Sequence, residues 1–351
     1  MTTPYRAVRD VLTRTGPYRA VPTGRPGELT GASTPEQART RAAHPSTVPS
    51  SMSGICGRMV AVTPATDRPN TPAPERFRPA PARPRLIATD LDGTLLRDDK
   101  TVSDRTVTAL AAAERAGIEV FFVTGRPARW MDVVSAHVHG HGLAICANGA
   151  AVVDLHQGGL PVEVRPLATD RALTIVAALR EAAPGTSFAV ERSGGIFYEP
   201  QYPPFHLDPG AVVAPAEKLL HDGFAHADMP VLKLLAHHPE LAPDSFLQLA
   251  RTVAGAYGDF TRSSPSALLE VSGLGVSKAS TLARCCAERG ISASEVVAFG
   301  DMPNDLEMLM WAGTSYAMAN AHPDVLAATT HRTGANTEDG VAVVIERILA
   351  G

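Results

Sequence analysis

Apolar and polar positions follow a regular pattern only after residue 85. From there on, short apolar runs that are typical of buried parallel strands alternate with segments of helical periodicity. A first helix is expected after Ser103, with Val107 and Leu110 on one face, and it should end at Gly117. The expected strands are 86–89, 118–123, 143–147, 296–299 and 315–318. This alternation predicts an α/β fold built on a parallel sheet.

Residues 1–84 lack this pattern and differ in composition from the rest of the chain. They hold 14 of the 29 Pro and 12 Arg against 5 acidic residues, a net charge of +7, whereas the remaining residues carry −11. Such a segment buries too little apolar surface to offset the entropy of ordering. We therefore predict a disordered extension with one short helical stretch near 5–12.

The function of this extension has several interpretations. An Arg-rich arm could contact nucleic acid or anionic lipid, and an organelle transit peptide is a further alternative. We favour translated upstream sequence, with the true start at Met52 or Met59. A chain that begins at Met59 is therefore expected to keep full activity and stability.

Length and composition exclude several classes of protein. The 351 residues, 36.9 kDa in mass, suffice for about two domains. No apolar run approaches the ~18 residues of a transmembrane helix. Four cysteines without a CxxC pair are too few for a disulfide scaffold, so we expect a cytoplasmic protein. We expect neither a membrane nor nucleic acid as a partner. Nothing in the sequence indicates an oligomeric state.

Polar clusters follow several of the expected strands, at the point where each strand ends. They are Asp90-Leu91-Asp92-Gly93, Thr124-Gly125-Arg126, Asn148-Gly149 and Gly300-Asp301-Met302-Pro303-Asn304-Asp305. Taken alone, each cluster is as typical of an ordinary turn as of a functional site. Because ligands of parallel sheets bind beyond the carboxyl ends of the strands, we expect the clusters to converge on one rim.

This rim should carry a metal site and a phosphate site. Four carboxylates are expected in one small volume, those of Asp90, Asp92, Asp301 and Asp305. Like charges so close raise one another's pKa unless a cation neutralises them, and oxygen ligands without His or Cys favour Mg²⁺. Thr124 and Lys278 offer a hydroxyl and a positive charge for phosphoryl oxygens. The reaction class is phosphoryl transfer through an aspartyl-phosphate.

In combination, these motifs resemble those of the haloacid dehalogenase (HAD) superfamily. The four motifs are Asp90-Leu91-Asp92-Gly93-Thr94-Leu95, Thr124-Gly125-Arg126, Lys278 and Gly300-Asp301-Met302-Pro303-Asn304-Asp305. Three further segments narrow the resemblance to the Cof-type hydrolases of subfamily IIB: Asn148-Gly149-Ala150, Ala319-Asn320-Ala321 and 333–341. The resemblance spans about residues 85–349 and implies a Rossmann-like core, an inserted cap domain and Mg²⁺ as cofactor.

The resemblance also implies a role for each site residue. Asp90 is expected as nucleophile and Asp92 as general acid/base, with Thr124 and Lys278 completing the catalytic set. The expected metal set is Asp90, Asp92 through its backbone carbonyl, Asp301, and Asp305 directly or through water. The expected substrate-binding set is Thr124, Gly125, Arg126, Asn148, Lys278 and Asn304. Ala279 follows Lys278 where relatives commonly have Gly, and we expect only a small backbone adjustment from it.

Spacing along the chain places a second domain inside the first. Only 33 residues separate Asp90 from Thr124, whereas 129 separate Asn148 from Lys278, far more than a loop allows. We predict an inserted domain at 166–264, in the family an α+β cap of type C2, between core segments 85–165 and 265–351. Its expected elements are a helix after Thr169 and strands 187–190, 195–198, 231–236 and 267–271, the last returning the chain to the core. Four residues either line the pocket or form an exposed loop: Tyr198, Glu199, Tyr202 and His206.

These features predict a Mg²⁺-dependent phosphatase for a small phosphorylated metabolite, such as a sugar phosphate or a phosphorylated cofactor. A phosphomutase of the same subfamily and a non-catalytic phosphate-binding protein are the alternatives. A mutase needs an Arg-rich pocket for a bisphosphate, whereas the arginines of the expected cap are scattered: Arg171, Arg180, Arg192, Arg251 and Arg262. A protein that only binds phosphate has no need of Asp92 as general acid/base. A zinc site at His137, His139 and His141 is disfavoured, because no carboxylate or Cys partner stands at a known spacing.

Overall fold

The computed structural model describes residues 83–135, 142–157, 160–203, 211–264 and 266–351. Three expectations lie outside these residues: the disordered extension with its short helix, the alternating histidines at 137–141, and the placement of His206. Both sheets described below belong to one compact unit of the chain. No helix within the described ranges is both long and apolar enough to span a membrane.

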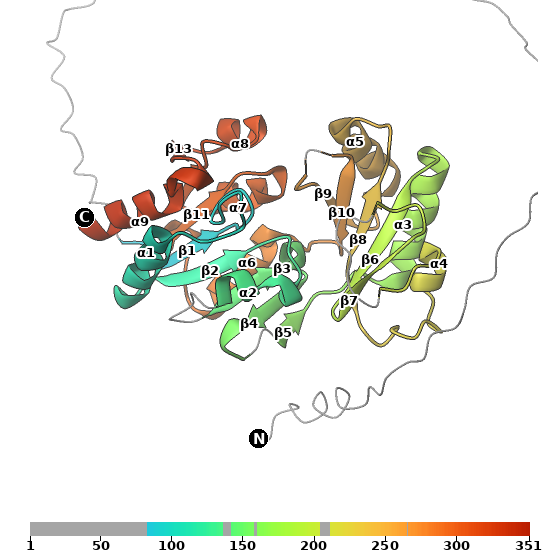
Figure 1. Ribbon diagram of the computed structural model, residues 1–351, viewed down its shortest axis with the longest axis horizontal. Helices are drawn as coiled ribbons and strands as arrows, with labels where there is room; N and C mark the ends of the chain where they lie inside the picture. Colours follow the sequence, from blue (N-terminus) through green and yellow to red (C-terminus); the bar gives the residue numbers. More distant parts are fainter. Residues whose placement is uncertain (1–82, 136–141, 158–159, 204–210, 265) are drawn as a thin grey trace, which may run out of the picture. The chain divides into compact units, whose positions relative to one another are not determined.

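An eight-stranded sheet forms the core, in the order β13-β12-β11-β1-β2-β3-β4-β5 (Figure 1). The strands from β13 to β3 are parallel, and β4 and β5 continue the sheet antiparallel. Their bounds are β1 Leu86–Thr89, β2 Glu119–Val123, β3 Leu143–Cys146, β4 Ala151–Asp154, β5 Leu160–Val164, β11 Val296–Gly300, β12 Thr314–Ala317 and β13 His331–Arg332. The five strands expected from the apolar runs are confirmed, and the hairpin of β4 and β5 was not among them.

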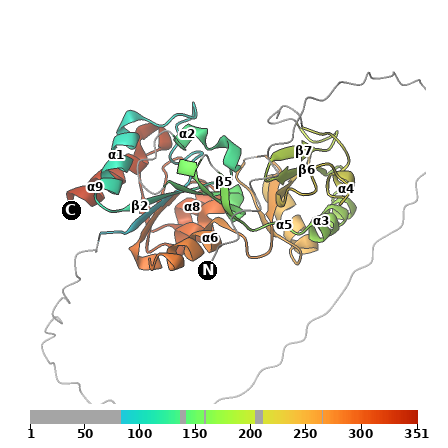
Figure 2. The same cartoon turned by 90° about the horizontal axis from the view of Figure 1, so that it is seen from below.

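Helices cover both faces of this sheet (Figure 2). On one face α1 (Asp104–Arg115) packs against α9 (Gly340–Ala350), and on the other α6 (Lys278–Glu288) packs against α7 (Leu306–Trp311). The first helix begins where expected, because the Ser103 side chain accepts a hydrogen bond from the Thr106 backbone N–H. The shorter helices are α2 (Asp132–Ser135) and α8 (Pro323–Ala328). This layered α/β arrangement confirms the predicted fold class.

A second, five-stranded sheet is antiparallel throughout, in the order β7-β6-β8-β10-β9. Its strands are β6 Ser187–Arg192, β7 Gly195–Tyr198, β8 Val231–His237, β9 Asp259–Thr261 and β10 Leu268–Ser272. Its helices are α3 Thr169–Ala182, α4 Ala216–Leu219 and α5 Pro243–Ala254. These elements share a hydrophobic core of their own, separate from that of the parallel sheet. We refer to this sheet and its helices as the cap.

The end of the cap differs from the expected position. The predicted boundary lies after Ser264, and the strand at 267–271 was expected to return the chain to the core. In the structure β10 pairs with β8 and β9, so the antiparallel sheet runs on to Ser272. An apolar run alone does not tell which of two sheets a strand joins, because both sheets bury such runs.

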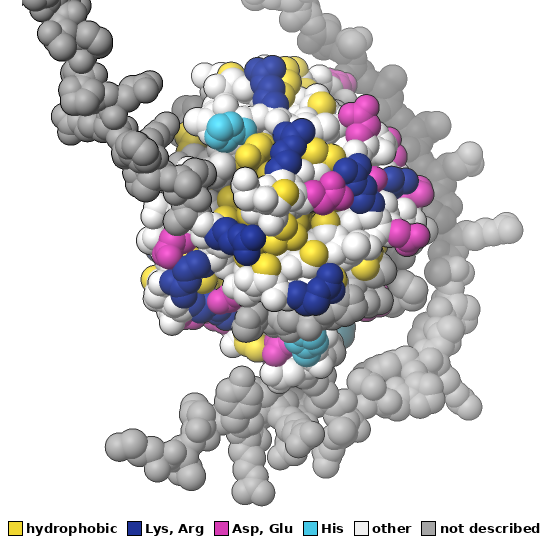
Figure 3. Space-filling view, turned by 90° about the vertical axis from the view of Figure 1, so that its left-hand side faces the viewer, with side chains coloured by type: hydrophobic (Ala, Val, Ile, Leu, Met, Phe, Trp, Pro, Cys, Tyr) yellow, Lys and Arg dark blue, Asp and Glu magenta, His cyan; other side chains and the backbone are white. Residues whose placement is uncertain are grey.

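Charged side chains are mixed on the molecular face in Figure 3. Over its described part, Lys and Arg side chains stand singly, with acidic, polar and apolar side chains between them. That nucleic acid is not a partner stays a prediction.

Candidate active site

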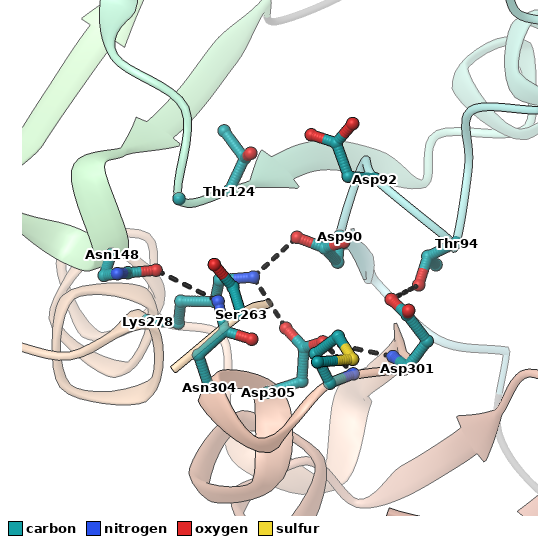
Figure 4. Close-up of polar contacts among 12 residues, drawn as sticks. Asp90, Asp92, Thr94, Thr124, Asn148, Ser263, Lys278, Asp301, Asn304 and Asp305 are labelled. Atoms are coloured by element: carbon teal, nitrogen blue, oxygen red, sulfur yellow. Dashed lines mark hydrogen bonds and ion pairs between the residues drawn. The ribbon is translucent and has the colours of Figure 1, made fainter. Parts of the chain in front are cut away.

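Three carboxylates meet at the carboxyl ends of two neighbouring strands (Figure 4). Asp90 follows β1, whereas Asp301 and Asp305 follow β11, and the two strands pair in parallel. Oxygen atoms from the three side chains lie within 4.8 Å of one another. All three residues are buried, and Asp305 is fully inaccessible. The convergence expected from the strand order therefore holds for these three acids.

Lys278 supplies the positive charge inside this acidic group. Its Nζ atom donates to Asp90 Oδ1 at 2.5 Å and to Asp305 Oδ1 at 2.7 Å, and the side chain is only 1% exposed. The residue is placed by the start of α6, where Ser277 and Ser280 form reciprocal capping hydrogen bonds. Ala279, which stands where relatives commonly have Gly, continues the same helix as a buried residue. Lys278 is therefore still placed in the site.

Burial and mutual repulsion raise the pKa of two of these acids. Burial raises the pKa of Asp90 well above its usual value, and Asp305 and Asp301 add to this effect although Lys278 opposes it. Burial, followed by the charge of Asp305, raises the pKa of Asp301 to about 7. A cation at this position would offset the repulsion between the carboxylates that contributes to these raised pKa values. A set of oxygen donors at this spacing fits a divalent ion such as Mg²⁺.

Neighbouring groups fix the orientation of the acids. Thr94 donates its hydroxyl to Asp301 Oδ1 at 2.8 Å, and Asp305 Oδ2 accepts the backbone N–H groups of Asp301 and Met302, each at 3.1 Å. Gly93 has φ +81°, and a Cβ there would lie 2.2 Å from Asp301 Oδ2. Only glycine therefore allows the loop after β1 to pass so close to the acidic group.

The side chain of Asp92 does not join this group. Figure 4 shows its carboxylate turned away from Lys278. Arg126 binds it with two hydrogen bonds, Nε to Oδ2 at 2.6 Å and Nη2 to Oδ1 at 2.8 Å, and Lys100 Nζ adds a third at 3.0 Å. Although burial raises the pKa of Asp92, these hydrogen bonds outweigh it and lower the pKa to about 2. The expectation of four carboxylates in one volume thus holds for three, because an arginine two residues after Thr124 draws the fourth away.

Thr124, Asn148 and Asn304 lie around the same site. The Thr124 hydroxyl accepts the Arg126 backbone N–H at 3.1 Å, and the Thr124 carbonyl accepts that of Asn148 at 3.0 Å. Asn148 has left-handed backbone angles, φ 56° and ψ 31°, and its Oδ1 accepts from Asn304 Nδ2 at 3.1 Å. The Asn304 Oδ1 atom is buried and meets no hydrogen-bond donor among the described residues. This acceptor therefore remains for a bound molecule or water.

Two buried charged residues of the cap contact the core loops, and neither was expected from the sequence. Lys233 Nζ donates to the Gly125 carbonyl at 2.8 Å and to Glu270 Oε2 at 2.7 Å. Glu270 also accepts from Asn148 Nδ2 at 2.6 Å. Burial raises the pKa of Glu270, but Lys233, Ser263 and Asn148 outweigh it and hold that pKa below its usual value. The signals for this network were one charged residue within each of the apolar strands 231–236 and 267–271.

A cavity of about 600 Å³ lies beside Asp90, the one of the three acids that lines it. Its core side includes Asp90, Asp92, Thr124, Gly125 and Arg126. Its cap side is lined by residues of the four strands β6, β7, β8 and β10 and of adjoining loops: Glu191, Ile196, Tyr198, Tyr202, Lys233, Leu235, Ser263, Ser264, Ser266, Leu268 and Glu270. Of the four loop residues considered in the sequence, Tyr198 and Tyr202 line the cavity. Glu199 instead holds the loop together, because it accepts the Phe188 and Ala216 backbone N–H groups.

Known proteins resemble this chain over the same region. Residues 87–345 match the haloacid dehalogenase-like hydrolases. A 5-amino-6-(5-phospho-D-ribitylamino)uracil phosphatase of Bacillus subtilis is 30% identical over 265 residues, which cover 74% of this chain and 94% of that protein. A pyridoxal phosphate phosphatase of Escherichia coli is 29% identical, over 74% of this chain and 97% of that protein. Among solved structures, the HAD subclass IIB sugar phosphatase BT4131 has a TM-score of 0.62 at 20% identity, covering 75% of this chain and 98% of that one.

The family match spans most of the chain and contains the three acids, Lys278 and Thr124. The parallel core, the inserted antiparallel sheet and the motif residues at the strand ends agree with the resemblance seen in the sequence. The chain therefore belongs to the haloacid dehalogenase superfamily, as a Cof-type phosphoric monoester hydrolase.

Proposed function

We propose that this protein is a Mg²⁺-dependent phosphatase that hydrolyses a small phosphorylated metabolite through a phosphoryl group carried on Asp90. The observation that supports this most is the Asp90 carboxylate at the floor of the cavity, held by a buried lysine and flanked by two further acids. A carboxylate fixed in this way can attack a phosphorus atom brought to it from the cavity.

In the first step, an Asp90 oxygen forms a bond to phosphorus while the bond from phosphorus to the alcohol oxygen breaks. The Thr124 hydroxyl and the Lys278 ammonium are the groups that hold the phosphoryl oxygens in this proposal. Asn148 and Asn304 are joined by a hydrogen bond, and in this proposal they support the groups that hold the phosphoryl oxygens. These contacts position the substrate and stabilise the charge that moves onto the phosphoryl oxygens.

Asp92 is the group proposed to move protons. Its carboxylic acid donates to the departing alcohol oxygen, and its carboxylate then accepts a proton from the water that attacks the phosphorus and frees Asp90. In the structure Arg126 and Lys100 keep this carboxylate ionised, which suits the second step. For the first step, Asp92 must leave these two cations and take up a proton. Arg126 is thus a positioning residue for Asp92 as well as a candidate substrate contact.

The residues present fit a magnesium ion. Asp90 and Asp301 would hold it, with Asp305 beside them and the Asp92 carbonyl as the further expected ligand. When bound, such an ion supplies positive charge for a phosphoryl oxygen and relieves the repulsion between the acids.

The proposed substrate class follows from the size of the cavity and from the relatives. A cavity of about 600 Å³ accommodates a small metabolite, and the similar proteins named above act on a phosphorylated ribitylaminouracil and on pyridoxal phosphate. The three described cysteines are free, which supports a cytoplasmic location.

The mutase alternative finds less support. Along the described cavity wall, the only arginine is Arg126 of the core. Arginines of the cap are engaged elsewhere: Arg180 with Glu199 and Glu217, Arg192 with two backbone carbonyls, Arg251 with the Phe260 carbonyl and Arg262 with Asp244. The arginine-rich pocket expected for a bisphosphate is therefore not found along the described cavity wall.

Phosphate release from a panel of metabolite esters tests the proposal. Wild-type protein with Mg²⁺ is compared with Asp90→Asn, which keeps the shape of the side chain but removes the nucleophilic charge. We expect the variant to lose at least ~10³-fold in kcat, and Ca²⁺ to inhibit because its looser coordination misplaces the nucleophile. Equal turnover by Asp90→Asn would exclude the nucleophile assignment, and undiminished turnover in Ca²⁺ would count against the metal site.

A further inference from the structure

A chain of hydrogen bonds leads from the cap to the core wall of the cavity. It begins at Glu270 on β10, where Oε2 accepts from Asn148 Nδ2 at 2.6 Å. Asn148 follows β3, and its Oδ1 accepts from Asn304 Nδ2 at 3.1 Å (Figure 4). Asn304 follows β11 and lines the cavity together with Asp90 and Thr124. We refer to Glu270, Asn148 and Asn304 as the amide chain.

The charge of Glu270 determines the direction of every hydrogen bond in the amide chain. An ionised carboxylate only accepts hydrogen bonds, whereas an amide side chain can turn either its oxygen or its nitrogen toward a partner. The Lys233 ammonium lies 2.7 Å from the same Oε2 atom and favours the ionised form of Glu270. The Asn148 nitrogen must therefore face Glu270. This leaves the Asn148 oxygen for Asn304, which has to offer its nitrogen in turn.

The cap end of the amide chain is tightly held. Glu270 is 4% exposed and also accepts from the Ser263 hydroxyl, while Lys233 connects it to the Gly125 carbonyl at 2.8 Å. The Gly125 backbone passes so close that a Cβ there would lie 3.2 Å from Asn148 Oδ1 and 3.5 Å from Glu270 Oε2. Asn148 is itself only 2% exposed. Its amide is therefore bonded at both ends in a confined space.

The core end of the amide chain still has unused hydrogen-bonding capacity. Within the part of the chain that the structure describes, Asn304 Nδ2 donates only to Asn148, so the second N–H of this amide is free. The Asn304 Oδ1 atom is buried and meets no donor among the same residues. Buried polar groups without partners are costly unless a bound molecule supplies them. A phosphoryl group at this wall brings oxygen atoms that can accept the free N–H.

We propose that Glu270 is a positioning residue for phosphoryl transfer, which through Asn148 holds the Asn304 amide in the one orientation that offers its free N–H to the phosphoryl group. This inference rests on the proposed function. Asn304 is the residue that contacts the substrate, and Glu270 acts only through the amide chain. Without an acceptor at position 270 the Asn148 amide can turn over, and Asn304 then no longer has a single preferred orientation.

Hydrolysis of p-nitrophenyl phosphate by four proteins tests this proposal: wild type, Glu270→Met, Asn304→Ala and the double variant. We expect kcat to fall about 10-fold in Glu270→Met and about 100-fold in Asn304→Ala. Because Glu270 acts through Asn304, Glu270→Met should lower kcat by less than about 2-fold once Asn304 is alanine. Glu270→Gln should keep kcat within about 3-fold of wild type, because glutamine still offers an oxygen to Asn148.

Glu199→Met is the matched control. Glu199 is another buried carboxylate of the cap, 5% exposed and paired with Arg180, but it lies outside the cavity lining. Its replacement should change kcat by the same factor with and without Asn304→Ala. If Glu270→Met does not fold because Lys233 is left unpaired, Glu270→Met and Glu270→Gln are compared in a Lys233→Met background. The methionine variant should again be about 10-fold slower.

Several results would overturn the positioning role. One is an equal loss of kcat from Glu270→Met with and without Asn304→Ala, which indicates a direct substrate contact or a general structural loss. Another is a Glu270→Gln variant as slow as Glu270→Met. A third is the same dependence on Asn304 in Glu199→Met.

Failure of the proposed function is recognised separately. If wild-type protein with Mg²⁺ hydrolyses no ester, the phosphatase proposal fails, and calorimetric titration with inorganic phosphate then tests the amide chain alone. Binding that is about 10-fold weaker in Glu270→Met, with no such difference in Asn304→Ala, supports the positioning of Asn304. Equal weakening in both backgrounds, or no phosphate binding by wild-type protein, overturns it.

Discussion

Replacing Lys233 with methionine would leave a buried carboxylate without its cation. In the wild-type protein Glu270 is 4% exposed and Lys233 6% exposed, with Nζ 2.7 Å from Oε2. Removing one partner of a buried ion pair costs about 3–5 kcal/mol, because the remaining charge stays desolvated. The Gly125 carbonyl also loses its hydrogen bond from Lys233. We expect Lys233→Met to lower the free energy of unfolding by about 3–5 kcal/mol near pH 8.

The pH dependence of this loss has a definite sign. In the wild type the folded-state pKa of Glu270 lies below its unfolded value, so its contribution to stability is present above the unfolded pKa and disappears as pH falls through the folded one. Without Lys233, burial becomes the dominant influence and raises the folded pKa above the unfolded one. The Lys233→Met deficit should therefore shrink by more than about 1 kcal/mol between pH 8 and pH 5.

Urea unfolding of four proteins measures this: wild type, Lys233→Met, Glu270→Gln and the double variant. The glutamine cannot be ionised, so the double variant should recover about 2 kcal/mol relative to the lysine variant alone. Its stability should also lose the pH response assigned to Glu270. Two results would refute the assignment of a coupled buried pair. One is a loss of unfolding free energy in Lys233→Met that stays constant from pH 8 to pH 5. The other is a double variant whose loss of unfolding free energy equals the sum of the two single losses.

Three further predictions concern the acidic group and the thiols. Gly93→Ala forces a Cβ to within 2.2 Å of Asp301 Oδ2, so we expect about 100-fold lower kcat with an unchanged circular dichroism spectrum; wild-type turnover would contradict it. Mg²⁺ at about 100 times its Kd should raise the free energy of unfolding by about 2.7 kcal/mol, measured with and without EDTA. The same rise in Asp305→Asn would speak against a cation beside these acids. Burial raises the pKa of both the Cys146 and the Cys286 thiol to about 12, so iodoacetamide near pH 8 should modify them only after unfolding in urea, as mass spectrometry can show.

The core of the site could be predicted because its geometry is set by strand order alone. Asp90 and Asp301 each follow an apolar run, and parallel neighbours bring the ends of such runs together. Lys278 could be assigned to the site from the family resemblance, and the structure shows that Ser277 caps the helix on which it stands. The roles of these residues in catalysis remain predictions.

Other features depend on contacts between segments far apart in the sequence. The direction of the Asp92 side chain is decided by Arg126, 34 residues away, and no local pattern records that pairing. Lys233 and Glu270 stand in apolar strands without a motif, and their burial becomes evident only when β8 and β10 lie side by side. The membership of β10 in the cap sheet was missed for the same reason.

The lysine within the acidic group also sets the charge that a bound cation must carry. With all three carboxylates ionised, Asp90, Asp301 and Asp305 together with the Lys278 ammonium leave two negative charges in a buried volume. One divalent ion neutralises this excess, whereas a monovalent ion leaves half of it. Burial and the charge of Asp305 raise the pKa of Asp301 to about 7, so we expect an entering cation to displace protons and its affinity to rise as the solution becomes more alkaline. The preference for a doubly charged ion is therefore a matter of charge balance as well as of ligand chemistry.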